Sequence, residues 1–457
     1  MESSQGLRDD WLEANGLLSE KERAFLMGTQ VWGDQSLFSA EDSLDELEQL
    51  AGTAGVQVVG RNIQHLNAIN PATYIGSGKV EELRLLRQEL GFNLLIFDDE
   101  LSSAQLRNLE RAMGIKILDR TALILDIFAM HARTKEGALQ VALAQYTYRL
   151  PRLTRQWTHL SRQGVGGVGL RGPGETQLES DRREISRYMV RLQNELEQVR
   201  RQRGLQRRRR RRQGMSVVAI VGYTNAGKST LINRLADAQV LVEDKLFATL
   251  DPTTRRVALP SGKAVLFTDT VGFIQKLPTQ LVAAFRATLE EVQEADLLVN
   301  VADISDPHLL KKVEAVEEVL KEIGAGDKPV IMALNKVDLI DPDTDLHPDT
   351  GRFALRHSAV DELLQTYNHT VTISAEQGVG IEELLGMVER VLIDQMVEVE
   401  ATIPYRAGEL LDLWHRQGIV DEETYTPSGT KVRGKLPKWM LGMLTNGEEK
   451  EEAVDQT

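Results

Sequence analysis

The chain has 457 residues, a formal net charge of −14 and no cysteine. This length suggests about three domains, and the absence of cysteine excludes disulfide frameworks and thiolate metal sites, which fits a reducing cytoplasm. The polar residues 1–10 carry no secretory or transit signal and no apolar run reaches membrane-spanning length, so we expect a cytoplasmic protein without an integral membrane segment.

Residues 1–20 are predicted to be a flexible extension, and residues 21–137 an N-terminal α/β domain. Apolar runs typical of strands cover residues 25–31, 56–59, 94–97 and 115–118, and helical patterns cover residues 43–51, 80–90 and 104–113. Strands separated by helices predict a parallel sheet covered on both faces. Residues 74–79 resemble a truncated phosphate loop but lack its full spacing, so we interpret them as a turn before the next helix.

Residues 138–213 are predicted to form an antiparallel helical hairpin. Apolar residues recur at spacings of three and four from Leu139 to Leu150 and again from Ile185 to Val199. Six of the eleven residues 164–174 between them are glycine, so this tip can approach another surface closely. Its basic and aromatic flank favours binding to RNA, with a flexible linker as the alternative. The predicted RNA-binding residues are Arg155, Arg162, Gly166, Gly167, Arg171, Arg182 and Arg183.

The charge of the chain is unevenly distributed. Residues 181–213 contain thirteen arginines and no lysine against four acidic residues, a local charge of +9, so the rest of the chain carries −23. One cationic element on an acidic protein indicates a polyanion bound at one place. A solvated helix end is the alternative, but the six consecutive arginines at 207–212 favour nucleic acid.

Residues 222–229, Gly-Tyr-Thr-Asn-Ala-Gly-Lys-Ser, follow an apolar strand pattern and precede a helical one. This strand-to-helix context is typical of a phosphate loop, in which backbone amides and the helix N-terminus bind phosphate oxygens. Lys228 is expected between the β and γ phosphates, and Ser229 on a magnesium ion. A glycine-rich turn alone does not account for the Lys-Ser pair.

Further motifs follow in the order that a guanine-nucleotide switch requires. Thr249, twenty residues after Ser229, offers a second hydroxyl to magnesium. Asp269 is expected to hold magnesium through water, and the Gly272 amide to bind the γ-phosphate. The Asp338 carboxylate accepts two hydrogen bonds from guanine N1 and N2, which favours GTP over ATP, and the Ala375 amide can reach guanine O6.

The predicted site therefore has three overlapping sets of residues. The catalytic set is Lys228, Thr249 and Gly272, and the metal set is Ser229, Thr249 and Asp269. The nucleotide-binding set is Gly222, Asn225, Ala226, Gly227, Lys228, Ser229, Thr230, Asn335, Lys336, Asp338, Ser374 and Ala375. Residues 214–398 are predicted to form this GTPase domain, followed by a small C-terminal α+β domain at 399–446 and an acidic tail at 447–457.

Residue 273 is a phenylalanine, where many GTPases place a glutamine that orients the attacking water. A phenyl ring cannot orient water, so we expect slow hydrolysis by the free protein and acceleration by a partner.

With these residues assembled, the chain resembles the HflX family of GTPases over roughly residues 21–445. The resemblance rests on residues 74–79, on Gly-Pro-Gly-Glu-Thr-Gln-Leu-Glu at 172–179, on residues 246–255 and on Phe273. It implies a ribosome-associated, monomeric GTPase that binds the large subunit and its rRNA and separates stalled ribosomes, with the glycine-rich tip reaching the peptidyl-transferase region. It also implies ATP binding by the N-terminal region, where the residues show no complete nucleotide motif.

Three other functions remain open at this stage. A ribosome-assembly GTPase would use the same switch on another target. An ATP-driven RNA remodeller would use the N-terminal domain as its motor. In a non-catalytic RNA-binding scaffold, GTP would only stabilise the fold.

Asn225 yields the first testable prediction, because its amide oxygen can bind a potassium ion beside the phosphates or can simply tolerate a turn conformation. If it binds potassium, GTP turnover will be faster in potassium than in sodium at equal ionic strength. Equal rates would exclude the ion site.

Overall fold

The computed structural model describes residues 22–33, 37–152, 173–212, 215–236, 246–247, 253–276, 286–340 and 352–444. The chain forms two compact units. The first comprises Met1–Gln202, Val242–Asp251 and Val271–Leu289, and the second Arg203–Leu241, Pro252–Thr270 and Glu290–Thr457. Short segments of the predicted GTPase domain thus belong to the N-terminal unit, and the predicted domain boundaries stay predictions. Within the described residues, every helix is too short or too polar to cross a membrane.

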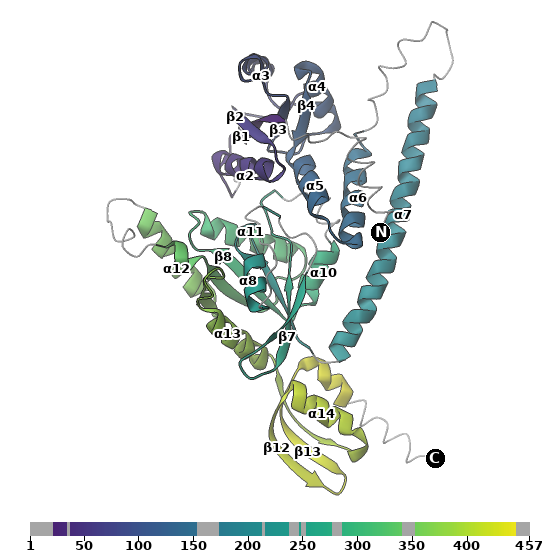
Figure 1. The fold of residues 1–457 in the computed structure, drawn as a ribbon, viewed down its shortest axis with the longest axis vertical. Coiled ribbons are helices and arrows are strands. Elements are labelled where there is room, and N and C mark those ends of the chain that lie inside the picture. Colours follow the sequence, from purple (N-terminus) through teal and green to yellow (C-terminus); the bar gives the residue numbers. More distant parts are fainter. Residues whose placement is uncertain are drawn as a thin grey trace. The chain divides into compact units, whose positions relative to one another are not determined.

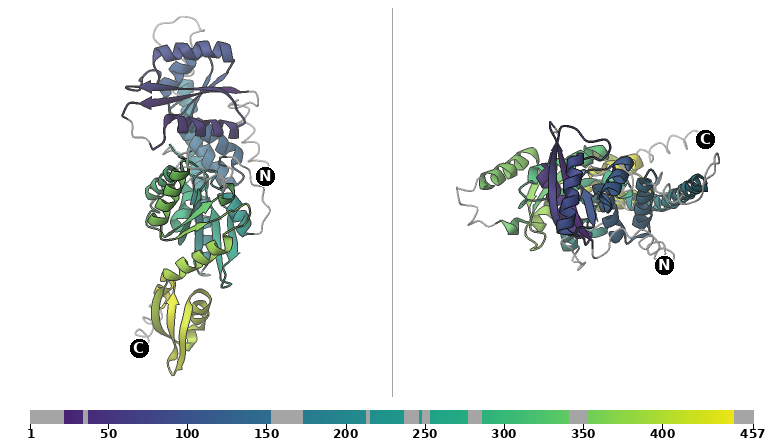
Figure 2. Two further views of the ribbon diagram at one scale, coloured as in Figure 1. Left: turned by 90° about the vertical axis from the view of Figure 1, so that its left-hand side faces the viewer. Right: turned by 90° about the horizontal axis from the view of Figure 1, so that it is seen from above.

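The N-terminal sheet has four parallel strands in the order β2-β1-β3-β4. Its elements are β1 (Arg23–Val31), α2 (Ala40–Thr53), β2 (Gln57–Leu66), α3 (Ser77–Leu90), β3 (Leu94–Phe97), α4 (Ser103–Met113), β4 (Lys116–Asp119) and α5 (Arg120–His131). Figure 1 and Figure 2 show α3 and α4 on one face and α2 and α5 on the other. Phe25 and Met27 face the core of α3 and α4, and the parallel sheet predicted from the sequence is confirmed.

Helix α5 was not predicted from the sequence. Its residues from Arg120 to Phe128 are all buried, so no polar face reveals a helical period. The Asp119 carboxylate begins the helix by accepting a hydrogen bond from the Ala122 amide at 2.9 Å.

Two helices, α6 (Lys135–Arg149) and α7 (Pro173–Arg212), occupy the region of the predicted hairpin. Tyr146 contacts Tyr188 edge-on at 5.1 Å, and Lys135 lies 3.9 Å from Glu195. Since these contacts run in opposite order along the two helices, the pair is antiparallel. On α7 the predicted apolar stripe is the buried side, as Leu192 and Leu196 show. On α6 the predicted stripe is only half-buried, because a deeper face packs on α5.

The GTPase sheet has six strands in the order β10-β9-β8-β5-β7-β6. Its elements are β5 (Val217–Gly222), α8 (Lys228–Leu235), β6 (Thr254–Ala258), β7 (Ala264–Asp269), α10 (Arg286–Glu294), β8 (Leu297–Asp303), α11 (Leu309–Glu322), β9 (Val330–Asn335), η2 (Val337–Leu339), α12 (Arg352–Thr366), β10 (Thr370–Thr372) and α13 (Ile381–Asp394). One core contains α8 and α13, and another contains α11 and α12. Strand β6 departs from the predicted alternation of strands and helices. The five residues between β6 and β7 are too few for a crossover to a parallel strand, so the two strands pair antiparallel.

The C-terminal domain is an antiparallel sheet, β11-β13-β12, covered by a helix. Its elements are β11 (Val397–Ile403), η3 (Tyr405–Ala407), α14 (Gly408–Gln417), β12 (Ile419–Thr426), β13 (Gly429–Leu436) and η4 (Lys438–Met440). Trp414 of α14 is fully buried against Val432 and Met440, which explains how so small a domain closes a core.

A buried ion-pair network joins the carboxyl end of β3 to two helices of the N-terminal domain. The Arg120 guanidinium lies 2.5 Å from Asp98 and also pairs with Glu46. Lys276, from the segment Val271–Leu289 of the same unit, reaches Asp98 at 2.5 Å and Asp99 at 2.6 Å. Burial raises the pKa of Asp98, but the two cations outweigh burial and leave that pKa below its ordinary value.

Replacing Arg120 with methionine should destabilise the N-terminal domain by about 3–5 kcal/mol, because Asp98 and Glu46 would stay buried without their main cation. Hydrogen exchange of the β3 amides measures this loss, which should shrink at low pH as the carboxylates take up protons. As a control, Arg61→Ala removes an exposed pair with Asp45 and should cost less than about 1 kcal/mol. Equal losses in the two variants would contradict the prediction.

Candidate functional site

The phosphate loop, residues 222–229, connects β5 to α8 and has two positions that only glycine can occupy. Gly222 has φ +145°, and a Cβ there would lie 2.3 Å from the Val301 carbonyl oxygen. Gly227 has φ +94°, and a Cβ there would lie 2.1 Å from Nδ2 of Asn335. Asn225, with φ +60°, adopts the left-handed turn conformation that the residue tolerates. The sequence therefore fixes a tight backbone turn directly before a helix N-terminus.

The Asn335 amide joins this loop to the segment after β10. Its Nδ2 donates to the Ala226 carbonyl at 2.8 Å, and its Oδ1 accepts from the Ala375 amide at 2.9 Å. In this arrangement the amide predicted to bind guanine O6 points at Asn335. A bond to O6 would have to be shared with Asn335.

Ser229 and Asp269, two residues of the predicted metal set, contact each other at the phosphate loop. The Ser229 hydroxyl donates to Oδ2 of Asp269 at 3.0 Å. Asp269 is 2% exposed and ends β7. A hydroxyl and a carboxylate together offer the hard oxygen ligands that Mg²⁺ prefers, so these residues fit the ion.

Lys228 is buried and turns back onto its own loop. Its ammonium donates to the Tyr223 carbonyl at 2.6 Å. Burial lowers the pKa of Lys228 to about 8, and the Asp269 carboxylate offsets only part of this effect. A bound phosphate would supply the negative charge that this ammonium lacks.

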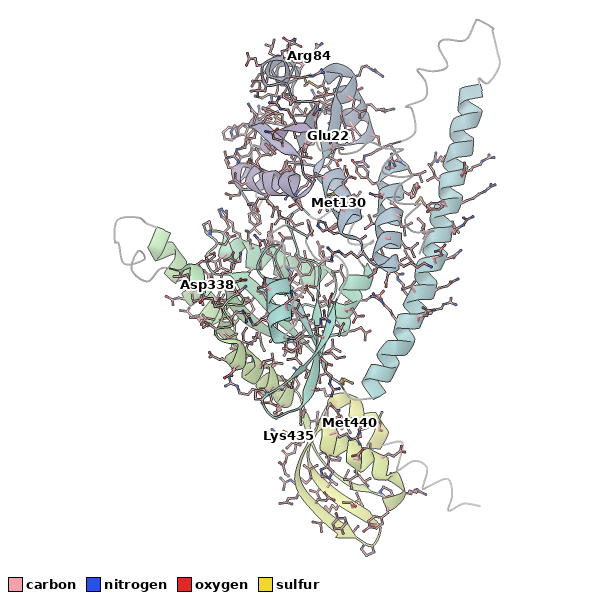
Figure 3. All side chains as sticks on the ribbon, in the orientation of Figure 1. Glu22, Arg84, Met130, Asp338, Lys435 and Met440 are labelled. Carbon is pink, nitrogen blue, oxygen red and sulfur yellow. The ribbon has the colours of Figure 1, made fainter. Side chains whose placement is uncertain are left out.

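The predicted guanine motif, residues 335–338, begins at the last residue of β9. Lys336 has φ +66° and pairs with Asp303 at 2.8 Å, which holds the turn. Within the described residues, the buried Oδ1 of Asp338 has no hydrogen-bond partner, and neither has the Thr224 hydroxyl of the phosphate loop. A buried acceptor costs free energy unless something donates to it. Asp338, labelled in Figure 3, thus fits a base that donates from N1 and N2.

The other predicted residues divide between described and undescribed parts of the chain. Ser374 is buried in the turn after β10, and Thr230 lies in the first turn of α8. Gly272 and Phe273 are buried in a segment of the first unit. Arg182 and Arg183 are exposed on α7. Outside the described residues lie Thr249, Arg155, Arg162, Gly166, Gly167 and Arg171.

Arg234, which binds the loop of residues 374–380 from α8, was not predicted from the sequence. A single arginine at the end of a helix matches no motif, so only the fold reveals its contacts.

Three family models match consecutive parts of the chain. The model described as GTP-binding GTPase N-terminal covers residues 41–129, and GTP-binding GTPase Middle Region covers residues 131–210. The model described as 50S ribosome-binding GTPase covers residues 217–336, which include β5, the phosphate loop and Asn335.

Two relatives named GTPase HflX match nearly the whole chain. The protein from Caldanaerobacter subterraneus subsp. tengcongensis is 46% identical over 420 residues, 92% of each chain. The protein from Escherichia coli K12 is 41% identical over 401 residues, 87% of this chain and 91% of the relative. A solved GTP-binding protein from Sulfolobus solfataricus, in complex with GDP, is 24% identical, with 81% of this chain and 98% of that chain covered and a TM-score of 0.40.

The lowered pKa of Lys228 predicts that nucleotide binding weakens in mild alkali. Phosphate binds the charged ammonium, whereas the free protein loses this charge as pH rises through about 8, so GDP affinity should fall by up to tenfold per pH unit above that pH. Titrations from pH 7 to 9 measure it. Lys228→Arg keeps its charge, so whatever affinity it retains should lack this dependence, and a constant wild-type affinity would contradict the assignment.

Proposed function

The chain belongs to the HflX family of ribosome-associated GTPases, and from that membership we propose that its GTP-bound form docks on the large ribosomal subunit and splits stalled or idle ribosomes. Binding of GTP and GDP and hydrolysis of GTP follow from the GTPase domain itself. The splitting reaction, the rRNA contacts and a cytoplasmic location are the proposal.

The observation that carries this proposal is the direct connection between the arginine-rich helix and the nucleotide site. Helix α7 ends at Arg212, and β5, which leads into the phosphate loop, begins at Val217. The thirteen arginines of residues 181–213 therefore directly precede, in the sequence, the strand and loop predicted to bind the nucleotide phosphates. Such a helix neutralises RNA phosphates, and the glycine-rich tip at its other end can order on unpaired bases.

In the proposed cycle, the site residues predicted from the sequence hold each end of the nucleotide. Lys228 neutralises the β and γ phosphates, and Ser229, Thr249 and Asp269 hold the magnesium ion, which supplies charge stabilisation when bound. Asp338 accepts from guanine N1 and N2. The Gly272 amide contacts the γ-phosphate and is released after hydrolysis, which gives the two states different contacts.

Hydrolysis by the free protein is proposed to be slow. Phe273 is 2% exposed, and a buried phenyl ring neither donates nor accepts a hydrogen bond to orient water. The missing polar group must come from a partner, and the ribosome is the proposed partner.

An ATP site in the N-terminal domain finds little support. In an open α/β sheet, ligands bind where the carboxyl ends of neighbouring strands diverge, here β1 and β3. That place carries Asp98 and Asp99, which repel a triphosphate, and their cations Arg120 and Lys276 are already paired. Lys79 of the truncated phosphate-loop motif binds Asn62 and Glu82 instead. The ATP-driven remodeller is therefore the weaker alternative.

The function is tested by sedimenting large subunits with the protein in the presence of GDP, GTP or a non-hydrolysable GTP analogue. We expect the analogue to give the tightest binding, at least tenfold tighter than GDP, and to reduce light scattering of intact ribosomes as they separate. Equal affinity in every nucleotide state would point to a scaffold. Binding without splitting, together with accumulation of precursor particles on depletion, would favour ribosome assembly.

The contribution of α7 is separable by replacing Arg207 to Arg212 with glutamine. The affinity for the large subunit falls with salt, and each lost phosphate contact should make the negative slope of log affinity against log salt shallower by up to about one unit. GDP affinity should stay unchanged. The matched control is the double variant Arg84→Gln and Arg416→Gln, which removes exposed cations from α3 and α14 and should leave the slope unchanged. An unaltered slope after the six replacements would contradict the role of the arginines.

A further inference from the structure

The loop of residues 374–380, which follows β10 and faces the predicted base site, is a tight turn. The Gly378 amide donates to the Ser374 carbonyl at 2.7 Å, and the Ser374 amide donates to the Val379 carbonyl at 3.0 Å. Gly378 and Gly380 have φ +82° and +74°. We call this segment the guanine loop. Its amides can read the 6-oxo group only if the loop is held in one place.

Arg234 holds the guanine loop from outside. The residue lies in the last turn of α8, and its Nε donates to the Ala375 carbonyl at 3.2 Å. A second guanidinium nitrogen donates to the next carbonyl, that of Glu376. The guanidinium also lies against Gly378, where an added Cβ would be 3.6 Å from Nε and Cζ of Arg234. The rigid fork of donors thus fixes two consecutive peptide groups.

The same helix serves both ends of the nucleotide. Helix α8 begins at Lys228 of the phosphate loop and ends one residue after Arg234. Asn335 makes the other link between these parts, from Ala226 to the Ala375 amide. Asn335 therefore accepts from the peptide group before the Cα of Ala375, and Arg234 donates to the peptide group after it. With a hydrogen bond on each flanking peptide group, Ala375 is held in one backbone conformation.

We propose that Arg234 is a positioning residue for guanine: it holds the guanine loop in place so that the Ala375 amide can be shared between Asn335 and the 6-oxo group, and so sets how long a guanine nucleotide stays bound and how well it is preferred over a purine without that oxygen. This inference rests on the proposed placement of guanine beside Asp338. Arg234 acts through the backbone and does not touch the base.

The test compares release of two diphosphates from the full chain, both with a fluorescent group on the ribose: GDP and the 2-aminopurine analogue, which lacks the 6-oxo group and the N1 proton. Wild type should release the analogue faster than GDP. Arg234→Ala should speed GDP release about tenfold and leave release of the analogue within twofold, and Arg234→Lys, with a single donor group, should fall between. The matched control is Arg416→Ala, which breaks an exposed pair with Asp412 and should change neither rate.

The outcomes separate the two ideas. Equal acceleration of both nucleotides by Arg234→Ala, or acceleration of neither, would overturn the role of Arg234 and leave the guanine placement standing. Equal release of both nucleotides from the wild type would overturn the placement itself. Should Arg234→Ala unfold, as a thermal melt would reveal, the Arg234→Lys variant carries the same comparison.

Discussion

The nucleotide site depends on the side-chain amide of Asn335, which is 2% exposed and bonded on both sides. A buried amide that loses a partner costs about 1–3 kcal/mol, so the phosphate loop and the guanine loop cannot separate without exposing or orphaning it. The requirement for glycine at position 227 follows from this contact, because Nδ2 of Asn335 occupies the space that a Cβ would need. One side chain therefore dictates both a sequence position and the distance between two loops.

Much of the fold was predictable from the sequence because its two larger sheets are mainly parallel and covered on both faces. Such strands are continuous apolar runs, and residues 94–97 were predicted with the bounds that β3 has. Helix α5 was not predicted because a helix buried on all sides also has a largely apolar sequence, which cannot be told from a buried strand. Strand β6, Thr-Arg-Arg-Val-Ala, shows neither an apolar run nor an alternation of polar and apolar residues, and only its pairing with β7 defines it.

The candidate site was predictable where a short segment determines its own geometry. The phosphate loop carries its turn, its glycines and its helix start within eight residues, so the motif and the structure coincide. Contacts between distant segments were not predictable. Arg234 lies 141 residues before Ala375, and Asp98 lies 178 residues before Lys276. Nothing in the sequence around Arg234 or Lys276 distinguishes these two residues from the many exposed arginines and lysines. Only the fold brings each of them to its partner.

Two residues of the GTPase portion of the chain show how such distant contacts maintain an unfavourable backbone. Phe247 and Lys276 have φ +58° and +51°, conformations that cost a bulky side chain on the order of 1–2 kcal/mol. Both lie in segments of the first unit: Phe247 packs edge-on against Phe128 at 4.6 Å, and Lys276 binds Asp98 and Asp99. These contacts offset the strain. The backbone conformations at Phe247 and Lys276, which lie close in sequence to Thr249 and Gly272, are thus stabilised by contacts with the N-terminal domain. Without these contacts, both residues would prefer a negative φ.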